Sequence, residues 1–267
     1  MSKISVGFLG TGNMGEAIIR GIVSVFKDDA EIYAFDIDSA KLEELKSINV
    51  IPVSTEKELC EKCKYDFLAI KPQVFETVLP KLAETVKEDT VLVSIAAGIS
   101  ESFIANTCGE KVHTVIVMPN TPFLLGEGAT ALAKGTYTTD EEFDIVKNIF
   151  CTGGVAEVVP MDKMKEIIAV NGSSPAFIYL YAKGFVDYAK AVGIDENTAL
   201  KLFSQSLIGS ARMLVDSGKT IDELIKQVSS PGGTTIAGLE KLYEGSILDD
   251  VKSACEACTA RAYELSK

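Results

Sequence analysis

Near its start the chain reads ISVGFLGTGNMG over residues 4–15, followed by EAIIRGIV over residues 16–23. A short apolar strand, a Gly-x-Gly-x-x-Gly turn and an apolar helix, in this order, are typical of a dinucleotide-binding βα unit. Gly10 allows the tight turn, Gly12 lets the backbone approach a pyrophosphate, and Gly15 lets helix and strand pack closely. The turn therefore predicts an α/β fold with a dinucleotide at the start of the first helix.

The next predicted strand, Glu31–Phe35, adds a second part of this pattern. It ends at Asp36, about twenty residues after the last glycine of the turn, where a carboxylate accepts hydrogen bonds from ribose hydroxyls. A glycine turn in some other kind of α/β protein is the alternative interpretation. The expected cofactor-binding residues of this region are Gly10, Thr11, Gly12, Asn13, Met14, Gly15 and Asp36.

Strand and helix patterns alternate over the first 160 residues. The later predicted strands are Val50–Val53, Phe67–Ile70, Val91–Ile95, Thr114–Val117, Gly128–Ala133 and Glu157–Val159. The helices predicted between them are Ser39–Ser47, Gln73–Val86, Ser100–Cys108 and Asp140–Phe150. Continuous apolar strands that alternate with helices indicate a mostly parallel sheet covered on both faces. Residues 1–160 are therefore predicted to form a Rossmann-type α/β domain that binds the dinucleotide.

Strand patterns end near Pro160, and only helical patterns follow. The predicted helices are Met161–Val170, Pro175–Val192, Asp195–Ser217, Thr220–Val228, Thr235–Leu242 and Ile247–Leu265. Residues 161–267 are therefore predicted to form a second, all-helical domain. Some of its helices, Ala176–Ala182 most clearly, are apolar around much of their circumference, and about a hundred residues cover such helices poorly. We therefore expect at least an obligate dimer.

Composition places the chain among globular proteins. It has 267 residues, of which 47% are hydrophobic, and contains no apolar run long enough to span a membrane. The sequence passes from Met1-Ser2-Lys3 directly into the first strand, so we expect no signal peptide and a cytoplasmic location. The formal net charge of −12 argues against a nucleic-acid partner, because phosphate contacts need a basic surface.

The six cysteines include two C-x-x-C pairs, Cys60/Cys63 and Cys255/Cys258. Two such pairs are a possible zinc site. However, each pair falls within a helical pattern, and the pairs lie about two hundred residues apart, unlike the compact spacing of a zinc ribbon. We expect reduced core cysteines and no metal, with zinc or a disulfide as the alternative.

Three loops that follow successive predicted strands carry polar or small residues. Lys71-Pro72 follows the first of these strands, Ala96-Ala97 the second and Asn120 the third. Open α/β sheets bind ligands at the carboxyl ends of their strands, so we expect all three loops to contact the cofactor. Each loop taken alone is also consistent with an ordinary connection.

A second anion site is predicted within the helical half, at Ser229-Ser230-Pro231-Gly232-Gly233-Thr234-Thr235. Pro231 ends the preceding helix by restricting the residue before it. The glycines then expose backbone N–H groups, and Thr234 and Thr235 open the next helix with hydroxyl donors at its positive end. The alternative interpretation is a helix–helix turn with a threonine cap.

The one histidine, His113, precedes a predicted strand rather than following one, so it is expected to be structural. Without a placed histidine, dehydrogenation of an alcohol by a general base is disfavoured. A protonated C=N group needs less help to accept a hydride. A hydroxyl donor to the ring nitrogen and an anion site for a carboxylate are enough, and Thr235 and the amides of Gly233 and Thr234 supply them.

Several blocks of the chain resemble pyrroline-5-carboxylate reductases, and they run in family order over nearly the whole length. These blocks are residues 8–15, Lys71-Pro72-Gln73, Met118–Pro122, Gly172–Ala176, Leu207–Leu214 and, most specifically, Ser229–Leu239. The resemblance implies a reductase that makes L-proline from Δ1-pyrroline-5-carboxylate with NADPH or NADH. It also implies a helical dimerisation domain, with homodimers that can assemble into decamers of five dimers.

In that family pattern the Ser-Pro-Gly-Gly-Thr-Thr loop holds the substrate carboxylate, and Thr235 contacts the ring nitrogen as the catalytic residue. The expected substrate-binding residues are Ser173, Ser230, Gly232, Gly233, Thr234 and Thr235. The other expected cofactor-binding residues are Lys71, Pro72, Ala96, Ala97 and Asn120, with the nicotinamide toward Asn120 and Ser173-Ser174.

The chain departs from the family pattern at two points. Met161 stands where members often have an acidic residue, so no substrate role is assigned to it or to Asp162. Asp36 stands where NADPH-preferring members commonly have a small or hydroxylic residue, and a carboxylate there repels a 2′-phosphate. Asp36 therefore favours NADH, with NADPH whose 2′-phosphate is held by a nearby loop as the alternative.

Two other functions remain open at this stage. A 3-hydroxyacid dehydrogenase has a similar glycine turn and a helical second domain, but relies on a lysine for which Lys183 is only loosely placed. A nucleotide-sensing protein that binds the cofactor without turnover does not need the anion site at residues 229–235. The sequence does not decide the oligomer size, regulation by proline or reduction of related cyclic imines.

Overall fold

The computed structural model describes residues 3–266 and divides the chain into two compact units. The first, the sheet unit, contains the described residues up to Ser173 together with those from Ala257 onward. The second, the helical unit, is Ser174–Glu256. The chain thus leaves the sheet unit after Ser173, later than Pro160, and its last helical turns return to it. The functional division at residues 160 and 161 stays a prediction.

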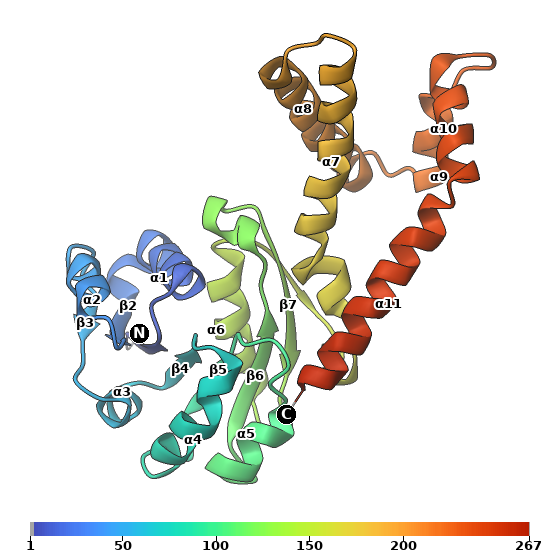
Figure 1. Cartoon of the computed structure of the whole chain (residues 1–267). Coiled ribbons are helices and arrows are strands. Elements are labelled where there is room, and N and C mark those ends of the chain that lie inside the picture. Colours follow the sequence, from blue (N-terminus) through green and yellow to red (C-terminus); the bar gives the residue numbers. More distant parts are fainter. Residues whose placement is uncertain (1–2, 267) are drawn as a thin grey trace. The chain divides into compact units, whose positions relative to one another are not determined.

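The sheet unit is built on eight strands in the order β3-β2-β1-β4-β5-β6-β7-β8 (Figure 1). They are β1 (Ile4–Leu9), β2 (Ala30–Phe35), β3 (Ile51–Pro52), β4 (Tyr65–Leu68), β5 (Val91–Ser94), β6 (His113–Met118), β7 (Gly128–Lys134) and β8 (Gly154–Val158). All neighbouring strands are parallel except β6 and β7, which are antiparallel. The prediction of a mostly parallel sheet, extended by two later strands, is confirmed.

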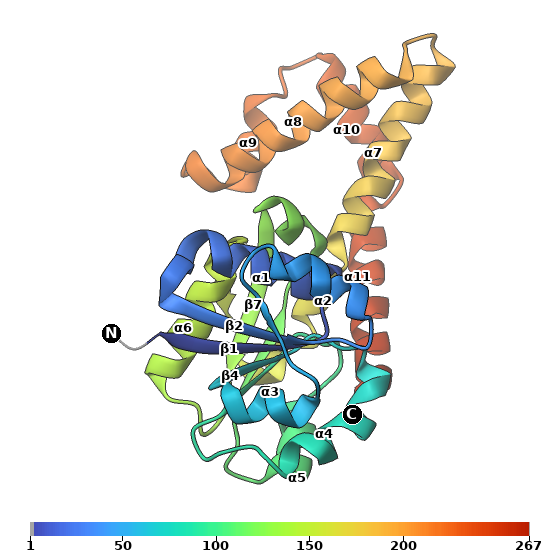
Figure 2. The ribbon, with the colours of Figure 1, turned by 90° about the vertical axis from the view of Figure 1, so that its left-hand side faces the viewer.

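Helices cover both faces of this sheet. They are α1 (Asn13–Phe26), α2 (Ser39–Lys46), α3 (Glu56–Lys62), α4 (Phe75–Ala83), α5 (Glu101–Cys108) and α6 (Asp140–Cys151). Figure 2 shows α1 and α2 on one side of β1, β2 and β4, with α3 and α4 on the other. One apolar cluster joins α1, α2 and α6 to the sheet, and a second joins α3, α4 and α5 to it.

The central strands are buried because both of their faces carry apolar side chains. Every residue of β4 and β5 is buried, as expected for a parallel sheet covered by helices. The rings of Phe8 and Phe67 stack at 4.8 Å in this core, and Phe150 of α6 packs on Phe67 at 5.9 Å. Helices α2, α3, α5 and α6 begin at side-chain caps, such as the capping box of Thr139 and Glu142 at α6.

The segment between Pro160 and Ser174 differs from the prediction. A regular helix was expected over Met161–Val170, but the structure has a 3₁₀ turn at Met161–Lys163 and a π-helical turn, η5, at Ile168–Gly172. The amide of Ser173 donates to the Ile168 carbonyl at 2.8 Å, which is the i→i+5 bond of a π-helix. The wider turn is held by side-chain bonds from Asn171 to two strand carbonyls.

The helical unit contains α7 (Ser174–Ala191), α8 (Glu196–Asp216), α9 (Ile221–Gln227), α10 (Thr234–Glu244) and the first part of α11 (Ile247–Leu265). Helices α7 and α8 pack together through Tyr181, Phe185 and Phe203, with the last two rings stacked at 4.1 Å. Other apolar side chains of α7 are exposed, including Leu180 at 70% and Tyr188 at 67%. They belong to an apolar groove of about 750 Å³ within this unit.

Candidate active site

The predicted cofactor residues lie along one edge of the sheet. Strands β2, β1, β4, β5 and β6 are consecutive neighbours and mutually parallel, so the loops that follow them emerge at the same edge. These loops carry Gly10–Gly15, Asp36, Lys71-Pro72, Ala96-Ala97 and Asn120. The structure therefore brings all the predicted cofactor-binding residues to one edge of the sheet unit.

The glycine turn between β1 and α1 is sterically constrained at two of its three glycines. Gly10 has a φ of +94°, and a Cβ there would lie 2.5 Å from the Ala69 carbonyl oxygen. A Cβ on Gly15 would lie 2.6 Å from the Gly10 carbonyl oxygen. Gly12 differs, because a Cβ there would meet no heavy atom of residues 3–266 within 4 Å. There is thus no room for a side chain at Gly10 or Gly15, whereas Gly12 faces open space.

The same turn leaves donors for an anion. Gly12 caps α1 without any side-chain bond, and the first intrahelical bond runs from Glu16 N to the Gly12 carbonyl at 2.9 Å. The amides of the first turn, Asn13 to Gly15, have no acceptor among residues 3–266. Free amides at the positive end of a 14-residue helix, beside an open glycine, fit a dinucleotide pyrophosphate.

Asp36 is tied to the glycine turn. Its Oδ2 accepts hydrogen bonds from the Thr11 amide at 2.6 Å and the Thr11 hydroxyl at 2.9 Å, and its Oδ1 accepts from the Asp38 amide at 2.9 Å. Partial burial raises the pKa of Asp36, but these hydrogen bonds outweigh it, with help from Lys41, and hold that pKa below its ordinary value. Asp36 is therefore an ionised acceptor at the position expected for the ribose.

The loops after β4 and β5 contribute surfaces of different kinds. Lys71 is exposed and precedes the 3₁₀ turn Pro72–Val74. Ala96 is 7% exposed and belongs to the core, whereas Ala97 is exposed at the sheet edge. A cavity of about 380 Å³ opens beside Ala96 and the end of β6. Small side chains at this point leave room for a flat ring.

Asn120, after β6, is 8% exposed, and both the oxygen and the nitrogen of its side-chain amide form hydrogen bonds within the protein. Its Oδ1 accepts from the Ala129 amide at 2.9 Å, and its Nδ2 donates to the Asn171 carbonyl at 3.1 Å. Asn171, in η5, donates to the carbonyls of Met118 and Ala129. Asn171 was not predicted from the sequence. Its only signal there is a single amide side chain between the apolar run IIAV and Gly172.

The predicted substrate residues fall in both units. Ser173 ends η5 in the sheet unit, whereas the loop of residues 229–233 joins α9 to α10 in the helical unit. Gly232 has a φ of +70°, which requires a glycine, and the Gly233 amide donates to the Ser230 carbonyl at 2.9 Å.

Helix α10 begins at Thr234 without a side-chain cap, and the amides of residues 234–236 have no acceptor in the described chain. Ser230, Thr234 and Thr235 are exposed within the chain. The loop is therefore a second uncapped helix start with hydroxyls beside it, as an anion site requires.

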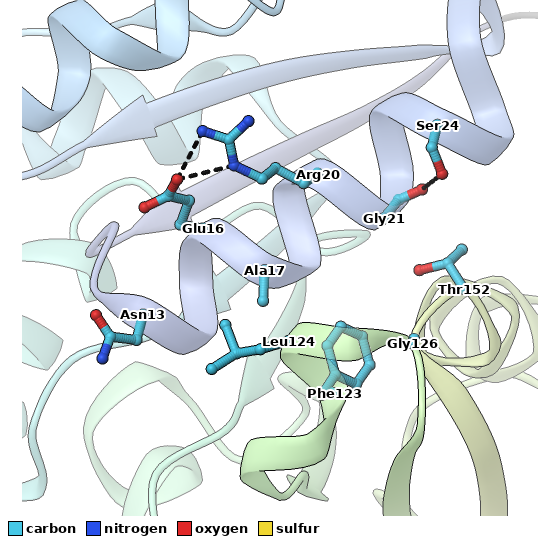
Figure 3. Close-up of a pocket in the computed structure, with 11 residues that line it drawn as sticks. Asn13, Glu16, Ala17, Arg20, Gly21, Ser24, Phe123, Leu124, Gly126 and Thr152 are labelled. Atoms are coloured by element: carbon cyan, nitrogen blue, oxygen red, sulfur yellow. Dashed lines mark hydrogen bonds and ion pairs between the residues drawn. The ribbon is translucent and has the colours of Figure 1, made fainter.

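A further pocket lies along α1 rather than at the sheet edge (Figure 3). Its volume is about 340 Å³, and Arg20 forms an ion pair with Glu16 at 2.7 Å on its wall. Asn13 is the one predicted cofactor residue among those that line it. The pocket thus adds no member to the set of predicted cofactor residues.

His113 is structural in this chain, as predicted. Its Nδ1 lies 2.7 Å from Glu142 Oε2 at the start of β6, the end opposite to the edge that carries the cofactor residues. Burial raises the pKa of Glu142, but hydrogen bonds from Thr139, His113 and Lys64 outweigh it and lower that pKa. Lys183 is likewise engaged, in an exposed ion pair with Asp187 on α7.

The cysteines are free thiols, with Cys60 and Cys63 buried in the core beneath α3. Burial raises the pKa of Cys60 to about 12 and raises that of Cys63 further. Among residues 3–266, no three His, Cys, Asp or Glu side chains are grouped so that they could hold a metal ion. Over the same residues, no helix combines the length and the apolar character needed to cross a membrane.

Two family models match the chain. The model of pyrroline-5-carboxylate reductase dimerisation covers residues 161–265, and the model of NADP oxidoreductase, coenzyme F420-dependent, covers residues 5–98. The match to the first model includes the loop at residues 229–235. The match to the second includes the glycine turn and Asp36.

Full-length relatives agree with these matches. A pyrroline-5-carboxylate reductase of Arabidopsis thaliana is 34% identical, covering 99% of this chain and 96% of its own, and that of Escherichia coli is 32% identical with 98% of each covered.

Solved structures of such enzymes also superpose over the whole chain. The enzyme from Coxiella burnetii has a TM-score of 0.92 at 27% identity, covering 98% of each chain. The enzyme from Plasmodium falciparum, solved with NADP bound, has a TM-score of 0.87 at 26% identity, covering 100% of each. The chain belongs to the pyrroline-5-carboxylate reductase family, whose members are NAD(P)-dependent oxidoreductases.

Proposed function

We propose that the chain reduces Δ1-pyrroline-5-carboxylate to L-proline, the last step of proline biosynthesis, with a reduced nicotinamide dinucleotide as hydride donor. The observation that carries this proposal is the presence of two uncapped helix starts of different kinds in one chain. One, at Gly12 of α1, lies beside an ionised ribose acceptor, and the other, at Gly233 of α10, lies beside hydroxyl donors. The first suits a dinucleotide and the second suits a small carboxylate.

The bound nicotinamide supplies the hydride, and the chain supplies its orientation. The pyrophosphate is held by the free amides of α1, and Gly12 lets it approach the backbone. Lys71 and Pro72 flank the middle of the cofactor, and Ala96 and Ala97 leave room for the flat ring. The other members of the predicted contact set, Thr11, Asn13, Met14, Gly15 and Asn120, are assigned to the same ligand.

On the substrate side, we assign the carboxylate to Ser230 and to the Gly232–Thr235 loop, with Ser173 beside the ring. The amides at the start of α10 and the positive helix end favour an anion there. The Thr235 hydroxyl donates a hydrogen bond to the ring nitrogen of the imine. When the adjacent carbon accepts the hydride, the C=N π electrons move to this nitrogen, which takes up one proton from solvent. Because positioning and charge complementarity do most of this work, no general base is required.

We further propose that NADH is preferred over NADPH. The Asp36 carboxylate is ionised and fixed by Thr11 and Asp38, so a 2′-phosphate beside it meets a permanent negative charge. Lys41, on α2, is the cation that weakens this repulsion. The NADP found in the Plasmodium falciparum enzyme is the competing expectation, which a direct comparison of the two cofactors decides.

We propose a homodimer formed through the helical unit. The dimerisation model covers residues 161–265, and α7 exposes large apolar side chains along the groove of this unit. Assembly into a decamer of five dimers, a cytoplasmic location and reduction of related cyclic imines stay predictions. Light scattering, cell fractionation and an imine panel check them in turn, and a stable monomer would contradict the dimer.

The direct test is the loss of nicotinamide absorbance when the purified protein is mixed with Δ1-pyrroline-5-carboxylate and either NADH or NADPH. We expect stoichiometric oxidation of the cofactor with L-proline as product, faster with NADH. Protein that binds the cofactor but does not oxidise it with this imine would contradict the proposed reaction. A catalytic efficiency with NADPH that equals or exceeds that with NADH would contradict only the assignment to Asp36.

A further inference from the structure

The antiparallel pair β6–β7 ends in a way that its register does not explain. Met118 pairs with Ala131 in the ladder, so a continued β6 would place Asn120 opposite Ala129. Pro119 cannot donate a ladder hydrogen bond, and after Asn120 the backbone turns into the 3₁₀ segment Thr121–Leu125. The two strands therefore separate at the edge of the sheet where the cofactor residues lie.

Two buried side-chain amides replace the missing ladder. The Asn120 Oδ1 accepts the Ala129 amide at 2.9 Å, where a strand carbonyl would otherwise accept it. The Asn171 Nδ2 donates to the Met118 carbonyl at 2.7 Å and to the Ala129 carbonyl at 3.0 Å, so a single NH2 group bridges both strands. The Asn120 Nδ2 closes the set by donating to the Asn171 carbonyl at 3.1 Å.

This four-bond set, the amide clamp, is nearly sealed from solvent. Asn120 and Asn171 are each 8% exposed. Both polar atoms of the Ala129 backbone are bound by the clamp. Buried polar networks whose members are hydrogen-bonded fix one geometry, because breaking any bond leaves a desolvated group unpaired.

We infer that Asn171 is a positioning residue for hydride transfer, which holds the Met118–Asn120 loop against the nicotinamide through the amide clamp. Asn120 then acts mainly through its backbone and the shape of the loop, because its side chain is bound into the clamp. This inference rests on the proposed function and adds to it a residue that is not expected to contact either reactant. A shift of the loop changes the angle of attack more than it changes cofactor binding.

Strand β6 offers a matched control at its opposite end. Thr138 is 4% exposed, and its hydroxyl accepts from the Thr114 amide at 2.8 Å and donates to the Thr114 carbonyl at 2.6 Å. Thr138→Val therefore removes two buried hydrogen bonds from the same strand, away from the cofactor edge. Asn171→Leu removes the two strand contacts of the clamp while keeping the branched side-chain shape, and the smaller Asn171→Ala serves if the leucine variant does not fold.

The experiment compares wild type, N171L and T138V with Δ1-pyrroline-5-carboxylate and NADH, well below the melting temperature of each protein. We expect N171L to lower kcat about tenfold or more with the KM for NADH within about twofold of wild type. T138V should melt at a lower temperature while its kcat stays within about twofold of wild type. Equal kcat in N171L and wild type, or an equal loss in T138V, would overturn the inference.

A second readout does not depend on the reaction. Hydrogen exchange of the backbone amides in residues 119–129 should be faster in N171L than in wild type and unchanged in T138V. If wild type does not reduce the imine, the proposed function fails and exchange alone decides whether the clamp holds the loop. Unchanged exchange in N171L would overturn the positioning role whatever the activity.

Discussion

The uncapped starts of helices α1 and α10 differ in the contacts that fix their backbone. At α1, a Cβ added to Gly10 or Gly15 would lie 2.5 or 2.6 Å from a backbone carbonyl oxygen, and Thr11 is hydrogen-bonded to the Asp36 carboxylate. At α10, a Cβ on Gly232 would meet nothing within 4 Å in the described chain, and Thr234 and Thr235 are exposed. The cofactor site is thus fixed by its own unit, whereas the substrate loop is held mainly by its backbone conformation.

This difference predicts which substitutions affect folding and which affect only chemistry. Changes in the α1 turn should act on stability and cofactor binding together, because the turn is part of the core. Changes in the α10 loop should act mainly on turnover, because few side chains pack there. The predictions below test this division, beginning with the largest expected effect.

Gly10→Ala should be the most damaging. The new Cβ clashes with the Ala69 carbonyl at 2.5 Å, and alanine is strained at a φ of +94°. We expect a loss of about 4 kcal/mol in the free energy of unfolding, with NADH binding abolished. Urea denaturation and NADH fluorescence titration measure the two effects. Gly232→Ala, which is strained at φ +70° but clashes with nothing, should lose less stability and keep NADH binding; the reverse ranking would contradict the division.

Asp66→Asn should reveal a pH dependence that belongs to the sheet unit. Asp66 in β4 is 1% exposed, and burial raises its pKa to about 7, although a hydrogen bond from the Cys60 thiol and the charge of Lys87 offset part of this effect. A carboxyl whose pKa is higher in the folded state than in the unfolded state destabilises the fold. The loss grows as the pH rises from the unfolded-state pKa to the folded-state pKa. The asparagine variant should therefore gain about 2–4 kcal/mol of stability at about pH 8 and almost none at about pH 4.

The stability of the helical unit should change with pH in the opposite direction. Hydrogen bonds from the Thr198 amide and hydroxyl lower the pKa of the Asp195 cap, and bonds from Thr220 do the same for Glu223. The contribution of these two carboxylates to the free energy of unfolding is present above the ordinary carboxyl pKa. It is lost as the pH falls through their folded-state pKa values. Denaturation curves of Asp66→Asn, of the exposed control Asp89→Asn in the same unit and of Asp195→Asn in the helical unit, taken across pH, separate the two signs. A gain for Asp66→Asn that does not grow with pH would contradict the buried-charge account.

Thr235→Ala should lower kcat for the imine by about 10- to 100-fold and leave the Kd for NADH nearly unchanged. The reason is that the hydroxyl is assigned to the ring nitrogen, in a unit that contains none of the predicted dinucleotide contacts. Thr235→Ser keeps the hydroxyl and should retain most of the activity. Steady-state kinetics and NADH titration of the two variants check this. Full activity in the alanine variant would remove Thr235 from the mechanism.

Asp36→Ser should have the smallest effect on the reaction. Removing the carboxylate removes repulsion of a 2′-phosphate, so the ratio of catalytic efficiencies, NADPH over NADH, should rise about tenfold. The Asp36 pKa is already lowered, so its charge is constant from about pH 5 to about pH 8, whereas the 2′-phosphate loses its second proton at about pH 6. In wild type the ratio should therefore fall as the pH rises through this range. Competition kinetics with both cofactors measure the ratio. A ratio unchanged by the substitution would show that Asp36 does not select the cofactor.

The sequence predicted the sheet unit well because its signals are local. The turn of residues 10–15, the apolar strands and the capped helices each follow from near neighbours along the chain, and the loops at Lys71, Ala96 and Asn120 follow from strand direction. The regular helix predicted over Met161–Val170 was wrong, because a 3₁₀ turn and a π-helical turn stand there. The hydrophobic pattern of these residues is helical, but contacts with β6 and β7 widen the turn at its end.

The missed features depend on partners that are distant in sequence. Asn171 bonds to Met118 and Ala129, more than 40 residues away, and no local pattern indicates this. The charge state of Asp66 depends on burial between neighbouring strands, which the one-letter pattern DFLA does not distinguish from an exposed carboxylate. Within the site, the positions of the loops were predictable, and the bonds that fix Asn120 and Asp36 were not.

The most direct test of the central claim is the fate of the transferred hydrogen. The protein is incubated with Δ1-pyrroline-5-carboxylate and NADH carrying deuterium at the transferring C4 position, and the product is analysed by mass spectrometry and NMR. The account predicts L-proline with one deuterium on C5, the carbon next to the ring nitrogen. Proline without deuterium at C5, or oxidation of NADH without proline, would contradict hydride transfer to the C=N bond.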